Sequence, residues 1–352
     1  MHILVTNDDG PPSHHSSPYV RCLVHHLQQA GHTVSVCLPD SQRSWIGKAH
    51  MIGQTVKPRY YRPGAGLHGE EAQGTTHHRP TASGNEEEWV LVDGTPASCV
   101  QIGLHHFFCE RGPIDLVVSG PNYGRNTTAV FALSSGTLGA ALEAAVCRWR
   151  AIALSFAFFS RNHDPLIIDG ACRHSVRVIE ALWKQWPADN SVDLYSVNVP
   201  LVEGAEKNKT MFTKMLQNYW GDGSCFEEVE GSIGDVDEEE ERIREGALGE
   251  ATPNNGHMAA GGKNGLSHKH FKWAPKFGDV YKSVEQSGPG SDGWEVKEGN
   301  TRYVICAMPC PPRLFFFGAP SLATMITDGN SITPMKANFW HQTDGLPKEL
   351  EL

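Results

Sequence analysis

Over its first 200 residues the chain alternates short apolar segments with helical segments, and this alternation limits the folds open to it. Most apolar segments end at a turn-forming residue, as expected of strands that are buried on both faces. Strands that alternate with helices form crossover units, which give a mostly parallel sheet with helices on both faces. We therefore predict an α/β protein with a three-layer αβα, doubly wound, Rossmann-like core.

The expected elements follow in order along this core. The expected strands cover residues 2–6, 33–38, 89–92, 114–118, 151–157 and 194–199, and the expected helices cover residues 18–30, 95–108, 136–148 and 169–186. Residues 62–88 are rich in Gly, His, Thr and Glu without periodicity, so we predict a flexible insertion there.

We assign residues 1–200 to the core and residues 201–352 to a smaller C-terminal extension that contains β-structure. Within the extension, residues 221–272 are acidic and then Gly- and Asn-rich, which predicts a disordered insertion. Residues 303–327 are apolar and Pro-rich, and they are unlike the sequence around them.

Composition restricts the class of protein. Hydrophobic residues make up 39% and charged residues 20%, which is typical of a soluble globular chain. The net charge of -10 argues against a nucleic-acid duplex as partner. No apolar run reaches the roughly 18 residues that a membrane span needs, so no membrane partner is expected.

The nine irregularly spaced cysteines indicate buried free thiols in a reducing compartment, and we predict a cytoplasmic location. The four histidine pairs, such as His25-His26, are interpreted as surface residues rather than zinc ligands.

Polar clusters follow four of the expected strands. They are Asn7–Gly10, Asp40–Ser44, Asp93–Pro96 and Ser119–Asn126. In a parallel sheet these loops lie at the carboxyl edge, where open α/β folds bind ligands. Four polar loops at one edge therefore predict a site there.

The side chains in these loops indicate a divalent cation. Asp8 and Asp9 end the first strand, and Gly10 permits the tight turn that brings both carboxylates to one ion. Ser44 and Asn122 are expected at the same edge, and oxygen ligands suit Mg²⁺, Mn²⁺ or Ca²⁺. The alternative is that Asp8 and Asp9 only form a turn or cap a helix.

The segment 134–145 (SSGTLGAALEAA) adds a candidate anion site. Ser134, Ser135 and Thr137 precede or begin a helix of small residues, and helix N-termini bind anions through free amides and the helix dipole. The alternative is plain N-capping by Ser135. A divalent cation beside an anion site predicts phosphoester hydrolysis.

Five motifs in order, LVTNDDG, DSQRS, VDGTPASCV, DLVVSGPNYGRN and SSGTLGAALEA, resemble the survival protein SurE family of metal-dependent nucleotidases and acid phosphatases. The resemblance covers residues 1–160 and resumes at YSVNVP (195–200) and DGNSITP (328–334). It implies a SurE-like fold and hydrolysis of small-molecule phosphomonoesters, namely nucleoside 5′- and 3′-monophosphates and other phosphoesters. It also implies a homodimer or homotetramer.

The resemblance also implies roles for individual residues. A Mg²⁺ or Mn²⁺ ion would be held by four residues, and the substrate phosphate by four others. The implied metal ligands are Asp8, Asp9, Ser44 and Asn122, and the implied phosphate ligands are Asn126, Ser135, Gly136 and Thr137. Asp8, Asp9 and Asn122 are the candidate catalytic residues, and Ser134 is added to the substrate site from its place before the helix. Water activated by the cation is the favoured nucleophile, and attack by Asp8 to form a covalent phosphoenzyme is the less favoured route. No residue is identified that protonates the leaving group.

The sequence departs from the family pattern in several places. Residues 11–17 (PPSHHSS) lengthen the turn after the first strand, and the acidic insertion falls where the family makes oligomer contacts. Residues 303–327 separate two motifs that the family joins almost directly, either as a genuine insertion or as translated intron.

Two other functions fit parts of the sequence. Val92-Asp93-Gly94-Thr95 is similar to the DxDGT signature of haloacid-dehalogenase-type phosphatases, but Leu91 stands where that signature needs its nucleophilic Asp. The other function is a nucleotide- or phosphate-binding module with weak catalysis or none.

Overall fold

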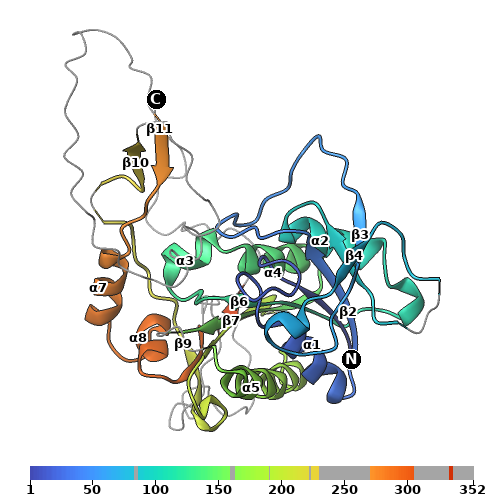
Figure 1. Ribbon diagram of the computed structural model, residues 1–352. Coiled ribbons are helices and arrows are strands. Elements are labelled where there is room, and N and C mark those ends of the chain that lie inside the picture. Colours follow the sequence, from blue (N-terminus) through green and yellow to red (C-terminus); the bar gives the residue numbers. More distant parts are fainter. Residues whose placement is uncertain are drawn as a thin grey trace, which may run out of the picture.

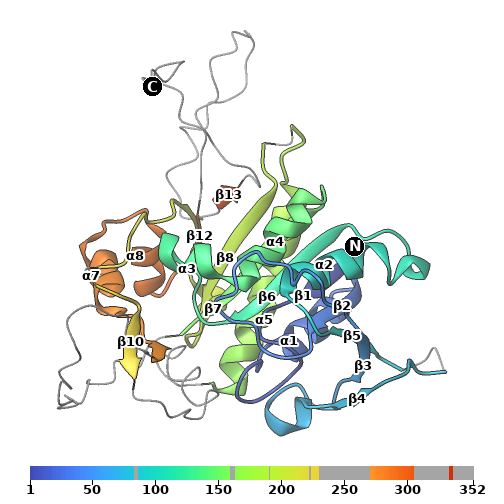
Figure 2. The ribbon, with the colours of Figure 1, turned by 90° about the horizontal axis from the view of Figure 1, so that it is seen from above.

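The computed structural model describes residues 1–82, 86–158, 163–189, 191–221, 223–229, 270–304 and 333–335. Figures 1 and 2 show a central sheet with helices packed on its two faces. The predicted three-layer α/β architecture is confirmed.

Within the described residues the main sheet has 11 strands, in the order β4-β3-β5-β2-β1-β6-β7-β8-β12-β9, with β13 also paired to β8. Their bounds are β1 His2–Thr6, β2 Thr33–Pro39, β3 Pro58–Arg62, β4 Thr75–His77, β5 Trp89–Val92, β6 Leu116–Tyr123, β7 Arg150–Ala157, β8 Leu194–Pro200, β9 Thr210–Thr213, β12 Thr301–Val304 and β13 Thr333–Met335. A separate antiparallel pair is formed by β10 Phe226–Val229 and β11 His270–Trp273.

The chain reverses its direction of winding at the centre of the sheet. Strand β1 pairs in parallel with β2 on one side and with β6 on the other. The chain builds outward from β1 through β2 to β5, and then returns to add β6, β7 and β8 on the opposite side. The β1/β6 boundary is therefore a topological switch point, where open α/β sheets bind ligands.

Two layers of helices cover the sheet (Figure 1). The helices are α1 Val20–Gln29, α2 Pro96–His105, α3 Thr128–Ser134, α4 Gly136–Val146, α5 Pro165–Lys184, α7 Gly278–Gln286 and α8 Asp292–Lys297, and the 3₁₀ turns are η1 Gly69–Ala72, η2 Cys109–Arg111 and η3 Ala205–Lys207. Ile3 and Val5 of β1 face the core under α1 and α5, whereas Leu4 faces the core under α2 and α4. Because successive strand residues point to opposite faces, the three central residues of β1 are all apolar.

The structure differs from the predicted elements in two places near the switch point. Strand β6 continues to Tyr123, although the sequence predicted a loop after Val118. An irregularity in its pairing with β7 lies between Ser119 and Asn122, and polar residues continue the strand beyond it. Helix α3 was not predicted, because its seven residues are too short to show a helical period.

Short elements also occur in the segments that were read as insertions. Strand β4 and η1 lie within residues 62–88, and β4 pairs antiparallel with β3. Residues 83–85, 230–269 and 305–327 lie outside the described residues, so the predictions for 221–272 and 303–327 fall mostly outside them. Strands β9 and β12 extend the same sheet as the core, and the division at residue 200 stays a prediction.

Across the described part of the chain, no single helix combines the length and apolar character of a membrane span. Only the pair α3 and α4, bent by 68°, meets that standard together, by length and composition alone.

Candidate functional site

The turn after β1 is closed by one side chain. Asn7 Oδ1 accepts the Gly10 N–H, and Asn7 Nδ2 donates to Gly10 O, both at 2.9 Å. Gly10 has φ +86°, a left-handed conformation that glycine adopts without strain. This turn places Asp8 and Asp9 at the switch point, where they are only 2% and 1% exposed.

Each carboxylate is oriented by a donor from a different element. Thr137 Oγ1 at the start of α4 donates to Asp8 Oδ1 at 2.6 Å. The backbone N–H of Tyr123, at the end of β6, donates to Asp9 Oδ2 at 2.7 Å. The two aspartates are therefore fixed by the helix and the strand that meet at this edge of the sheet.

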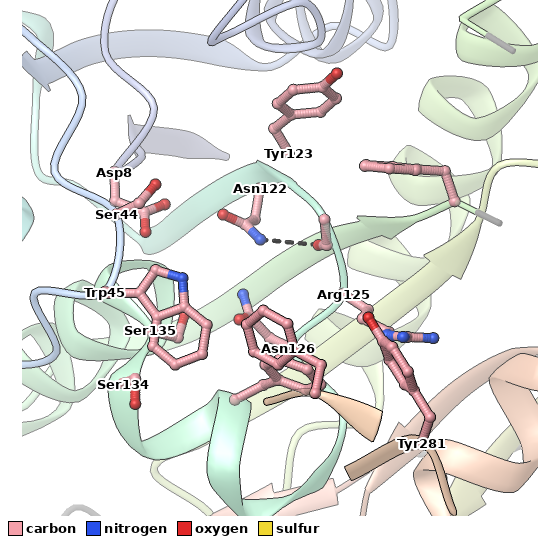
Figure 3. Close-up of a pocket in the computed structure, with 14 residues that line it drawn as sticks. Asp8, Ser44, Trp45, Asn122, Tyr123, Arg125, Asn126, Ser134, Ser135 and Tyr281 are labelled. Atoms are coloured by element: carbon pink, nitrogen blue, oxygen red, sulfur yellow. Dashed lines mark hydrogen bonds between the residues drawn. The ribbon is translucent and has the colours of Figure 1, made fainter. Parts of the chain in front are cut away.

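Two uncharged side chains whose oxygen atoms could bind a cation lie beside Asp8. Ser44 Oγ accepts a hydrogen bond from Gln42 Nε2 at 3.2 Å. Asn122 Nδ2 donates to Gly124 O at 2.8 Å, and Figure 3 shows its side-chain oxygen on the side of Asp8. The hydrogen bond thus turns the amide so that its oxygen, and not its nitrogen, is presented to Asp8.

These side chains line a pocket of about 90 Å³ (Figure 3). By volume the pocket has room for several water molecules, each of which needs about 10–15 Å³ on this measure. The polar lining comes from the turn after β1, the loop after β2, the end of β6 and the loop that follows it, and the α3–α4 junction. The lining residues are Asp8, Ser44, Trp45, Asn122, Tyr123, Gly124, Arg125, Asn126, Phe131, Ser134, Ser135, Phe158, Phe277 and Tyr281. Asp9 is buried beside the pocket and does not line it.

The predicted phosphate-side residues divide into two groups. Ser134 and Ser135 line the pocket, and Ser135 also caps α4 by accepting the Leu138 N–H at 3.1 Å. Thr137 and Gly136 instead face Asp8: a Cβ built on Gly136 would lie 2.7 Å from Asp8 Cβ. The start of α4 therefore packs directly against the carboxylate.

Asn126 lines the pocket but is also part of the scaffold. Its backbone N–H donates to Asn198 Oδ1 at 2.8 Å, and its Nδ2 donates to Ser155 Oγ at 2.9 Å. These bonds connect the loop after β6 to strands β7 and β8.

An aromatic wall, which the sequence reading missed, faces the polar side of the pocket. Trp45 follows Ser44 and has φ +61°, which costs a side-chain-bearing residue roughly 1–2 kcal/mol. Its ring centroid lies 5.9 Å from Phe131 and 5.8 Å from Phe277. The Arg125 guanidinium lies 4.6 Å from the Tyr281 ring centroid. Phe277 and Tyr281 come from the region of α7, which no motif connected with the site.

A histidine beside the pocket was also missed. His163 Nε2 is 3.1 Å from the Tyr123 hydroxyl, and its Nδ1 is 3.0 Å from the Tyr19 hydroxyl. The signal was present in the sequence, because His163 follows the fifth predicted strand and so belongs to the same carboxyl edge.

The loop Asp93–Pro96 does not line the pocket. Arg43 instead bonds to it, through Nη2 to Asp93 Oδ1 at 3.1 Å and through Nε to Gly94 O at 3.3 Å. The Arg43 backbone N–H donates to Asp8 O at 2.7 Å, so this loop supports the site from outside.

The donor set fits a hard divalent cation. Asp8, Ser44 and Asn122 present oxygen atoms to the pocket, Asp9 is fixed beside them, and no thiol or imidazole is among the lining residues. Mg²⁺ and Mn²⁺ prefer such oxygen ligands. The start of α4 adjoins the same space and suits an anion.

The fold and the position of the pocket define the class: a doubly wound α/β protein with an oxygen-lined site at its switch point. The chain matches the family model described as Survival protein SurE over residues 3–222, which is more than half of its length. The chain therefore belongs to the SurE family, and the resemblance stated from the motifs is confirmed.

The chain is similar in sequence to a yeast protein of another name and to bacterial proteins named SurE. The chain is 35% identical over 304 residues to the probable tubulin–tyrosine ligase PBY1 of Saccharomyces cerevisiae, a match that covers 81% of this chain and 37% of the yeast protein. It is 37% identical over 214 residues to the 5′-nucleotidase SurE of Ruegeria pomeroyi, covering 58% of this chain and 70% of the relative. It is 30% identical over 248 residues to the 5′-nucleotidase SurE of a Nostoc species, covering 65% of this chain and 82% of the relative. The chain thus spans little more than a third of the yeast relative.

Among solved structures, the crystal structure of the SurE protein from Aquifex aeolicus is similar to this one. The TM-score is 0.52 at 20% sequence identity, and the match covers 86% of this chain and 92% of the other. This similarity supports the fold.

Proposed function

We propose that the chain is a divalent-metal-dependent phosphomonoesterase that hydrolyses nucleoside 5′- and 3′-monophosphates and related phosphoesters. Relatives at 30–37% identity are named 5′-nucleotidases, which supports phosphomonoester hydrolysis. The oxygen-lined pocket supports the metal, and the 3′-activity and the range of substrates rest on the resemblance to the family.

One observation carries the proposal: a single pocket has an oxygen-rich side and an aromatic side. Asp8, Ser44 and Asn122 lie on the first side, and Trp45 and Tyr281 lie on the second (Figure 3). A cation with a phosphate fits the first side, and a flat base fits the second by stacking. A nucleoside monophosphate has both chemical parts in one molecule.

The residues around the cation would have distinct roles. Asp8, Asp9, Ser44 and Asn122 would hold Mg²⁺ or Mn²⁺, which supplies a Lewis acid that polarises the phosphoryl group and activates water. Thr137 would be a positioning residue, since it touches Asp8 and lies outside the pocket lining.

The phosphate would lie between the cation and the start of α4. Ser134, Ser135 and Gly136 would supply hydroxyl and amide donors there, together with the helix dipole. Asn126 lines the same space. Arg125 adds a guanidinium, which pairs well with phosphate oxygens.

The test is phosphate release by the purified 352-residue chain from a panel of substrates. The panel is nucleoside 5′- and 3′-monophosphates, p-nitrophenyl phosphate and glycerol phosphate, each with Mg²⁺, Mn²⁺ or EDTA. The expected result is metal-dependent release with nucleoside monophosphates preferred over glycerol phosphate. A folded protein that binds nucleotide but releases no phosphate with either metal would instead be a binding module. A homodimer or tetramer stays a prediction, to be measured by light scattering.

A further inference from the structure

A second cluster of ligand-type side chains lies on the α1–α5 face of the sheet. Cys22 of α1, His68 before η1 and Asp169 of α5 have ligand atoms within 4.8 Å of one another. They come from three segments far apart in the sequence, and α1 and α5 pack side by side (Figure 1). On one tetrahedral zinc ion, such ligand atoms would be about 3–4 Å apart.

Two of the three side chains are of the kinds that zinc prefers. Thiolate and neutral imidazole are common zinc ligands, and Cys22 is fully buried, with the side chains of Cys172 and His26 beside it.

His68 supplies an independent sign of a missing partner. Its Nδ1 atom is buried, yet nothing in the described ranges hydrogen-bonds to it. A buried polar nitrogen without a partner costs about 1–3 kcal/mol. A metal ion bound by the His68 ring would give this nitrogen a partner and so remove the cost.

Asp169 is already oriented for coordination. His26, one helical turn after Cys22, has its Nε2 2.6 Å from Asp169 Oδ1, and Arg173 contacts Asp169 Oδ2. Hydrogen bonds of this kind to a ligating carboxylate fix its direction. The sequence reading of His25-His26 as surface residues missed this contact, because it comes from helix packing.

We propose that Cys22, His68 and Asp169 bind one Zn²⁺ ion, with His26 as a positioning residue and water in the fourth place. The thiolate and the imidazole select zinc over Mg²⁺, so this site differs chemically from the oxygen-lined pocket. The ion would fix the segment around η1, within residues 62–88, to the layer of α1 and α5.

The test measures zinc in the purified 352-residue chain after EDTA treatment, reloading with one equivalent of Zn²⁺ and gel filtration. Wild type is expected to retain one zinc per chain, and His68→Gln to bind it at least about 10-fold more weakly. Loading with Co²⁺ instead is expected to give a thiolate-to-cobalt charge-transfer band that Cys22→Ser abolishes. Zn²⁺ is also expected to raise the Tm of wild type but not of His68→Gln.

Two control variants distinguish zinc bound at this cluster from zinc bound at another thiol or in the pocket. Cys37→Ser changes another fully buried thiol and is expected to keep the zinc, and Asp9→Asn alters the pocket and is expected to keep it too. Because His68 lies before η1 outside the sheet, its variant tests the site even if Cys22→Ser does not fold. Zinc that is lost only in Asp9→Asn, or a cobalt complex without a thiolate band, would overturn the proposal.

Discussion

At the residue scale, the contact that most directly supports the pocket is the hydrogen bond from Thr137 to Asp8. Thr137 is fully buried, so its hydroxyl has a fixed direction. Thr137→Val keeps the shape of the side chain and removes the donor. We expect metal affinity or activity to fall about 10- to 100-fold, as for other groups that orient a metal ligand.

The measurement is Mn²⁺ affinity by calorimetry together with phosphate release. Thr33→Val, at an exposed position at the start of β2, is the matched control and is expected to behave as wild type. Equal affinities in Thr137→Val and Thr33→Val would contradict the positioning role.

Asp292 gives the chain a dependence of stability on pH. This carboxyl is 1% exposed and accepts the N–H groups of Thr128, Leu216 and Gly293. Burial raises its pKa from 3.8 to about 6 in spite of these bonds. Between those values the folded state binds more protons, so the contribution of Asp292 is complete below about pH 4 and is lost as the pH rises through 6.

The loss amounts to at most ~3 kcal/mol of unfolding free energy. Asp292→Asn cannot titrate, so its unfolding free energy should lack this decline. Urea unfolding of wild type and variant from pH 4 to pH 7 measures the difference. Parallel curves for the two proteins would show that Asp292 does not titrate in this range.

At the residue scale, the sequence predicted many of the polar side chains of the pocket. It did not predict the side chains that orient them or that form the aromatic side. Asp8, Ser44 and Asn122 were named from loop position, and all three line one pocket. The sequence SSGT could not show that Thr137 hydrogen-bonds to Asp8. Ser and Thr residues at the start of a helix can equally cap the helix, bind an anion or donate to a carboxylate. Likewise, the residue type of Trp45 does not reveal from the sequence that its side chain lines the pocket.

At the element scale, the approach of α4 to the end of β1 sets the geometry of the site. A Cβ on Gly136 would lie 2.7 Å from Asp8 Cβ and 2.9 Å from Asp8 Oδ2. Gly136→Ala should therefore displace Asp8 and lower activity by about 100-fold, the cost expected for a misplacement of about 1 Å.

Gly278→Ala is the matched control, since Gly278 is also the first residue of a helix and a Cβ there meets nothing within 4 Å. It should keep full activity and gain up to about 1 kcal/mol of stability. Phosphate release and thermal unfolding of both variants measure this. An active Gly136→Ala would show that α4 does not need to approach Asp8 so closely.

Most elements of the core were predicted because their apolar periodicity is clear. The elements around the pocket were harder to predict, because their residues are polar or their length is short. Strand β6 continues past Val118 with the polar residues that face the site, so hydrophobicity ends before the strand does. Helix α3 has seven residues, which are too few for a helical period to be recognised.

At the scale of the whole molecule, residues far apart in the sequence meet at one pocket. Tyr281 of α7 and Trp45 of the loop after β2 both belong to the aromatic side of the pocket (Figure 3). If this wall holds the base, Tyr281→Leu should raise KM about 10-fold for nucleoside monophosphates and leave KM for glycerol phosphate unchanged.

Steady-state kinetics on both substrates measure this split. Tyr219→Leu, at a tyrosine that is 82% exposed and outside the pocket lining, is the control. An equal rise in KM for both substrates would mean that Tyr281 supports the phosphate side instead.

The whole-molecule arrangement was the part least accessible from sequence. The alternation of elements predicted a doubly wound sheet, which is confirmed, but not the order in which the strands are placed. The contact of α7 with the pocket joins segments about 230 residues apart. Nothing local in either segment encodes that contact, since it depends on how the C-terminal strands β9 and β12 extend the sheet.

The most direct test of the central claim is phosphate release from a nucleoside 5′-monophosphate by wild type and Asp9→Asn. The account predicts that wild type needs Mg²⁺ or Mn²⁺, that EDTA abolishes its activity, and that Asp9→Asn loses at least about 100-fold. Metal-independent release, or an unchanged rate in a folded Asp9→Asn protein, would contradict the claim that the carboxylates at the end of β1 hold the cation.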